Sequence, residues 1–162
     1  MTKQLLLEQF TECYDRNGWF VAVRNAIEGV SAAQADWKPI GADNSIWQTL
    51  SHLTFYNFAY LERFKGNAYE YGIEDNDESF TAGESDEAWA SAVERFDAVM
   101  TEWRELISSS SDSKFNEPVS DTNKALWVTL IGEINAHNAY HAGQILLLRK
   151  LQGIWNPKQG VS

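Results

Sequence analysis

The stretch KALWVTLIGEINAHNAYHAGQILLLRKL, residues 124–151, decides the fold that the sequence predicts. Its apolar side chains recur every three or four residues, which is the spacing of one face of an α-helix. This inner face comprises Trp127, Leu130, Ile131, Ile134, His137, His141, Gln144 and Leu148. Because two histidines continue an apolar line, we expect both rings to point into a packed interior. Gly153 and Pro157 follow and end the predicted helix.

Three further segments share the helical period: residues 3–27, residues 46–64, and a segment that opens after Ser85. Acidic residues follow Ser85 in the first turn, where the helix dipole favours them. The sequence has no internal repeat and no strand-like alternation of any length. Four long helices joined by loops therefore predict an all-α protein built as a four-helix bundle.

Turn chemistry separates the predicted helices. Gly29 ends the first, and Asp43, Asn44 or Ser45 can cap the second, which Gly66 closes. The connection from residue 67 to residue 84 is rich in aromatic and acidic side chains. We expect it to be a long surface connection that is partly ordered over a cleft.

Length and charge limit the class of protein. The 162 residues fit a single domain, residues 1–162, with a core over about residues 3–152. Lys and Arg number 13 against 23 Asp and Glu, so the formal net charge is -10. Nucleic-acid binding depends on basic side chains that neutralise phosphates. We therefore expect no nucleic-acid partner, and we interpret the acidity as an aid to solubility.

Cys13 is the only cysteine, so no disulfide can form within the chain. The N-terminal residues lack the apolar region of a signal peptide, and no apolar stretch approaches the length of a membrane span. These features predict a cytoplasmic protein without a membrane partner. Since Cys13 lies on the apolar line of its helix, we expect a buried core residue rather than a reactive thiol.

The three histidines have the spacing of a metal site. His137 and His141 are four residues apart, so they return to nearly the same face of one helix. Two imidazoles placed in this way can converge on one ion, at about 2.0–2.1 Å if the ion is zinc. His52 flanks the apolar line of a second helix that can pack against the first. Hydrogen-bonded core histidines are the alternative, and the residues alone leave both interpretations open.

Several neighbouring residues are candidates for ligand contacts. Gln144 follows His141 by one turn and can orient a ligand, or it can bond to a neighbouring helix. Tyr56 is a second candidate for a substrate contact. Arg24 lies with Asn17 on the inner line of the first predicted helix and can hold an anionic group, although an ion-paired arginine is the commoner arrangement.

Two motifs resemble those of a known family. The segment ADWKPIGADNSIWQTLSHLTFY, residues 35–56, resembles the turn and histidine-bearing helix of the DinB superfamily, the DinB/YfiT-like metalloenzymes. The segment AHNAYHAGQILLLRK, residues 136–150, is similar to the HxxxH helix of that family. The similarity covers about residues 3–152.

This resemblance implies an up-down-down-up four-helix bundle. It also implies one divalent metal ion, with zinc or nickel as candidates, bound by His52, His137 and His141. Members are often homodimers, and some relatives are transferases or isomerases that use low-molecular-weight thiols.

On this basis we expect a metal-dependent S-transferase that joins a small thiol to an electrophilic small molecule. A metal-dependent hydrolase is the second hypothesis, with Glu133 as its general base, although a solvated helix residue is the ordinary role of such a glutamate. A third hypothesis is a stress-response protein that binds a metal or ligand without catalysis.

Overall fold

The computed structural model describes residues 2–160, in which six α-helices are joined by loops and three short 3-10 helices. The α-helices are α1 (Thr2–Tyr14), α2 (Val23–Ile27), α3 (Ala32–Asp36), α4 (Ile46–Phe64), α5 (Asp86–Ser109) and α6 (Trp127–Leu151). The 3-10 helices are η1 (Asn76–Ser79), η2 (Lys114–Asn116) and η3 (Pro157–Gln159). No β-strand and no helix suited to crossing a bilayer occur within the described residues.

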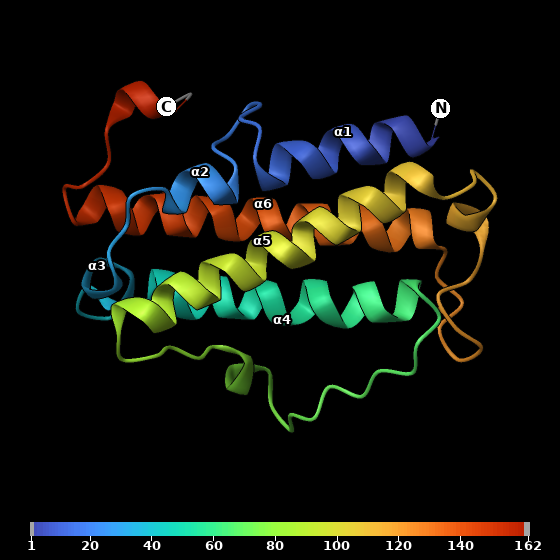
Figure 1. Ribbon diagram of the computed structural model, residues 1–162, viewed down its shortest axis with the longest axis horizontal. Coiled ribbons are helices and arrows are strands. Elements are labelled where there is room, and N and C mark those ends of the chain that lie inside the picture. The colour runs from blue at the N-terminus through green and yellow to red at the C-terminus, as the bar shows by residue number, and fades with distance from the viewer. Residues whose placement is uncertain (1, 161–162) are drawn as a thin grey trace.

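The four longer helices, α1, α4, α5 and α6, pack side by side along one axis (Figure 1). In this view α1 and α6 run in one direction, and α4 and α5 run in the other. Each of α4 and α1 contacts both α5 and α6. The interior between them is filled by wholly buried side chains, among them Phe10, Leu50, Trp103 and Ile131. The prediction of an all-α fold is therefore confirmed.

Helix α4, which carries one of the histidines, has the bounds that the sequence predicts. Ser45 is its N-cap, and a reciprocal capping box joins Ser45 to Gln48. The Ser45 hydroxyl accepts from the Gln48 N–H, and the Gln48 side chain accepts from the Ser45 N–H. Gly66 lies just beyond the helix with a φ of 89°, a conformation that glycine adopts at little cost.

The prediction of one continuous helix over residues 3–27 is wrong in the middle of that range. Helix α1 ends at Tyr14, and the chain becomes helical again only at α2. The Asn17 side-chain oxygen accepts hydrogen bonds from the Ala22 N–H at 3.0 Å and from the Asn25 side chain at 2.8 Å. Asparagine side chains compete with the helical hydrogen-bond pattern in this way. Asn17 therefore stabilises a turn and does not lie on the inner line of a helix.

The structure also corrects two smaller points. The linker between the first two predicted helices contains the short helix α3, for which Ser31 and Gln34 form a capping box. Helix α6 begins at Trp127 rather than at residue 124, because the preceding residues are held extended. Leu126 forms an isolated antiparallel bridge with Pro118.

Cys13 packs in the core, as its place on the apolar line of α1 predicts. It is 3% exposed, and its thiol donates a hydrogen bond of 3.2 Å to the Asn135 carbonyl. Burial raises the pKa of the Cys13 thiol to about 12. Because the thiolate is the reactive form, Cys13 is unsuited to be a nucleophile near neutral pH.

Candidate metal centre

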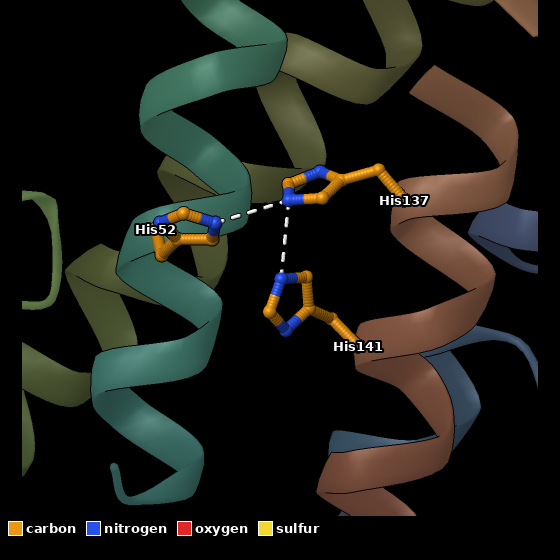
Figure 2. A group of neighbouring side chains, drawn as sticks. All are labelled: His52, His137 and His141. Carbon is orange, nitrogen blue, oxygen red and sulfur yellow. Dashed lines mark hydrogen bonds between the residues drawn. The ribbon is translucent and has the colours of Figure 1, made fainter. Parts of the chain in front are cut away.

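The three histidine rings meet between α4 and α6 (Figure 2). His52 projects from α4, and His137 and His141 project toward it from successive turns of α6. The Nε2 atom of His137 lies 3.0 Å from Nε2 of His52 and 3.1 Å from Nε2 of His141. His52 and His141 are buried, and the ligand atoms of all three rings lie within 4.8 Å of one another. The three residues can therefore hold a metal ion.

The outer nitrogen of His52 is held by the connection between α4 and α5. Nδ1 of His52 lies 2.7 Å from the Ser79 hydroxyl, which itself donates a bond of 2.6 Å to the Asn76 carbonyl. Because the hydroxyl hydrogen is used in that bond, the Ser79 oxygen accepts from Nδ1–H of His52. This leaves Nε2 of His52 without a hydrogen and facing the other rings.

The outer nitrogen of His141 is held within α6. Nδ1 of His141 lies 2.6 Å from the Gln144 side-chain oxygen, and the Gln144 amide nitrogen donates to the Tyr140 hydroxyl at 3.0 Å. An amide oxygen only accepts, so His141 carries its hydrogen on Nδ1 and presents a bare Nε2. Gln144 thus orients a ring of the site, and its bonds to His141 and Tyr140 both lie within α6 rather than reaching a ligand or a neighbouring helix.

The arrangement fits a cation better than a hydrogen-bonded core. Two bare nitrogens, on His52 and His141, face Nε2 of His137 at hydrogen-bond distance. His137 has at most one hydrogen on that atom, so one of the two contacts gains no linear hydrogen bond. Two nitrogens bound to one zinc ion lie about 3.0–3.4 Å apart for ordinary bond lengths and angles, which is close to the separations found here.

The surroundings of all three rings favour the neutral imidazole at pH 7. Burial, followed by the charges of His141 and His137, lowers the pKa of His52 to about 3. Burial and the charge of His141 lower the pKa of His137 to about 4. Burial also lowers the pKa of His141, against the opposing effect of its bond to Gln144. Since metals bind the neutral imidazole, these rings are competent ligands at pH 7.

A pocket with a cavity volume of about 400 Å³ opens beside the rings. Its lining residues are His52, Tyr56, Asn57, Tyr60, Asn76, Phe80, Leu130, Glu133, Ile134, His137 and His141. Among the residues that the sequence singled out, the pocket therefore includes Tyr56 and Glu133. The Tyr56 hydroxyl donates a hydrogen bond of 3.0 Å to the Asn76 side chain.

Arg24 lies elsewhere. It is not among the residues that line the pocket, and its Nε donates to the Asp97 carboxylate on α5 at 2.8 Å. The ion pair was the commoner of the two arrangements that the sequence allowed. We assign Arg24 no contact with a ligand at this site.

The sequence analysis did not identify the two residues of the 67–84 connection that contact His52. Phe80 stacks on His52 with ring centres 4.0 Å apart and planes 11° apart, and Ser79 binds the same ring. This places the connection over the centre, which agrees with the expected ordering over a cleft. No spacing rule predicts which loop side chain reaches a helix, so the aromatic composition of this segment was the one available signal.

The comparisons with known proteins agree with the geometry. No curated protein matches the chain. The family model of the DinB superfamily matches residues 21–145, which include all three histidines and most of the helices that carry them. The match covers more than half of the chain, and we conclude that this protein belongs to the DinB superfamily.

Proposed function

We propose that the protein binds one divalent metal ion through His52, His137 and His141 and acts as a metal-dependent S-transferase on electrophilic small molecules. The observation that carries the proposal is the convergence of three Nε2 atoms on one point at the wall of a pocket. Three neutral ligands leave a coordination position for an outside group, as in catalytic zinc sites. A bound ion would supply positive charge that lowers the pKa of a thiol at that position.

The chain's own residues prepare the site in three ways. Ser79 and Gln144 hold hydrogens on the outer nitrogens of two rings, which directs the bare Nε2 atoms inward. Phe80 covers one face of His52 and limits the access of water. Leu130 and Ile134 add an apolar wall, against which the carbon skeleton of a substrate can pack.

The test combines metal analysis with a turnover assay. Purified wild-type protein should carry close to one metal ion per chain, and His137→Ala should carry far less. A chlorinated aromatic substrate is then offered with a panel of low-molecular-weight thiols, with metal present and after its removal. We expect a thiol-dependent product that requires the metal. Absence of product with every thiol tried would contradict the transferase.

A metal-dependent hydrolase is the second candidate, and the place of Glu133 in the pocket favours it. Hydrolysis needs a general base near the bound ion, and Glu133 precedes His137 by one turn of α6. Ester or amide hydrolysis whose kcat falls at least 100-fold in Glu133→Gln would support this alternative over the transferase. Ligand-induced increases in Tm without any product would instead support a non-catalytic binding protein.

A further inference from the structure

The pocket beside the histidines has an unbalanced charge. Glu133 is the one carboxylate among its lining residues, and no lysine or arginine of the described chain lines it. The Glu133 side chain is exposed, and within residues 2–160 no basic side chain forms an ion pair with it. Glu133 therefore presents a negative charge to whatever occupies the pocket.

Arg63, on the same helix as two of the pocket tyrosines, does not offset this charge. Its guanidinium lies 4.4 Å from the ring centre of Tyr71 and 5.2 Å from that of Tyr60. It donates hydrogen bonds to the Tyr71 hydroxyl at 2.7 Å and to the Tyr69 carbonyl at 3.2 Å. Arg63 is thus occupied by the connection that follows α4 and does not reach into the pocket.

The segment at the mouth of the pocket adds to the negative field. Asn76 lines the pocket, and exposed acidic residues flank it on both sides in sequence, at Glu74, Asp75, Asp77 and Glu78. The chain as a whole carries a formal charge of -10. Fields of this sign concentrate cations and repel anions at the entrance to a cleft.

The remaining walls suit an apolar body. The rings of Tyr56, Tyr60 and Phe80 and the aliphatic side chains of Leu130 and Ile134 line the same cavity. Aromatic faces also attract cations. An ammonium group between a ring and a carboxylate is therefore stabilised both by the ring and by a charge-assisted hydrogen bond to the carboxylate. The three histidines lie at one part of this cavity, and Glu133 stands one helical turn away from His137.

From these features we infer that the pocket takes a ligand with a protonated amine on an apolar, aromatic-sized body, the amine lying against Glu133. The inference rests on the proposed function, because this ligand would be the thiol or the electrophile of the transfer reaction. It narrows that function to amine-bearing substrates and disfavours polyanionic ones. Glu133 is then a specificity-determining residue, whose carboxylate accepts hydrogen bonds from the ammonium group.

Isothermal titration calorimetry with two probes of equal shape tests the inference. These are 2-phenylethylamine, which is protonated at pH 7, and 2-phenylethanol, which is neutral. Each is titrated into the zinc-loaded wild type, Glu133→Gln and Glu94→Gln. Glu94 is exposed on α5 and does not line the pocket, so its variant is a control with the same loss of charge. Wild type and the control should bind the amine about fivefold more tightly than the alcohol, and Glu133→Gln should lose most of this preference.

Three outcomes would overturn the inference. They are equal affinity for the two probes in wild type, no binding of either probe, and a preference for the amine that is undiminished in Glu133→Gln. The last would mean that the amine is held by the metal ion, the aromatic rings or the acidic segment rather than by the Glu133 carboxylate. Because the titration requires no turnover, its result is independent of the thiol assay. A protein that fails this test but forms a thiol-dependent product would keep the proposed function and lose only the amine preference.

Discussion

At the scale of single residues, two hydrogen bonds determine which nitrogen of His52 and of His141 faces the centre of the site. Ser79 and Gln144 hold the outer nitrogens of His52 and His141, and both bonds are short, at 2.7 Å and 2.6 Å. Such outer partners fix the orientation of a ligating imidazole and raise its basicity. The affinity of the centre for metal should therefore depend on residues that never touch the ion.

Replacing Ser79 tests this dependence. In Ser79→Ala, Nδ1 of His52 loses its hydrogen-bond acceptor and the ring loses its preferred tautomer. We expect zinc affinity, measured by competition with a coloured chelator, to fall about 10- to 100-fold. Ser91→Ala, on the exposed face of α5, should bind zinc as the wild type does. Unchanged affinity in Ser79→Ala would show that the loop does not support the centre.

Whether a residue of the site could be predicted from the sequence depends on whether it lies on a helix or in a long loop. His137 and His141 could be paired from the sequence because helical periodicity fixes which residues share a face. Ser79 and Phe80 could not be assigned, because the path of a long connection depends on contacts that no local pattern encodes. Glu133 and Tyr56 were named as candidates, and their place in one pocket became evident only when α4 was packed against α6.

At the scale of elements, local hydrogen bonds decide where the helices begin and end. Ser45 is wholly buried and caps α4, the helix that carries His52. Its side chain also belongs to the capping box with Gln48. The boundaries of α4 were predictable because capping residues and a closing glycine are encoded locally.

Removal of this cap should destabilise the protein measurably. We expect Ser45→Ala to lower the free energy of unfolding by about 1 kcal/mol, the ordinary contribution of such a cap. Urea unfolding of the wild type and the variant gives the difference from the two midpoints. Ser91→Ala is the matched control, because alanine favours the interior of a helix and should cost nothing there. Equal midpoints for wild type and Ser45→Ala would contradict the assigned role.

The break between α1 and α2 shows where local patterns fail. The apolar spacing continues through residues 3–27, yet the chain leaves the helix after Tyr14. The Asn17 side chain bonds to the backbone and to Asn25, and the second of these bonds joins the turn to α2. The spacing of apolar residues indicates which residues face the core. It does not indicate whether the backbone between them stays helical.

Asn17→Ala should therefore destabilise the protein even though Asn17 is outside the core. Its loss leaves the Ala22 N–H and the Asn25 amide without their shared acceptor. We expect the free energy of unfolding to fall by about 1–2 kcal/mol, measured by urea unfolding. Since the turn lies away from the pocket, zinc affinity should be unchanged. A variant as stable as the wild type would remove the physical reason given for the break.

At the scale of the whole molecule, folding and the ionisation of the histidines are coupled. Burial holds the pKa of His52 at about 3 and that of His137 at about 4, against an ordinary value of 6.5. Between those values the unfolded chain binds protons that the folded chain does not. Stability therefore rises with pH in this range and is lost as the pH falls below about 6.5.

The metal-free protein should show this pH dependence clearly. We expect its Tm to fall steadily from pH 6.5 to pH 5, with chelator present throughout. Replacement of His52 and His137 by glutamine should make the dependence shallower over the same range, because two of the three buried histidines that titrate are gone. A Tm that is constant or rises as the wild type is acidified would contradict buried neutral rings.

The bundle as a whole was predictable because four long periodic segments leave few ways to bury their apolar faces. The meeting of His52 with the pair on α6 followed from that packing, and the resemblance of two motifs to one family supported it. The charge and shape of the pocket were not predictable, because they arise where α4, α6 and the 67–84 connection come together.

The most direct test of the proposed metal centre is a crystal structure of the purified protein, with diffraction recorded on both sides of the absorption edge of the metal that elemental analysis finds. We expect one strong anomalous peak per chain, within bonding distance of Nε2 of His52, His137 and His141. No peak at that point, with the three rings bonded only to one another, would contradict the metal centre and the chemistry proposed for it.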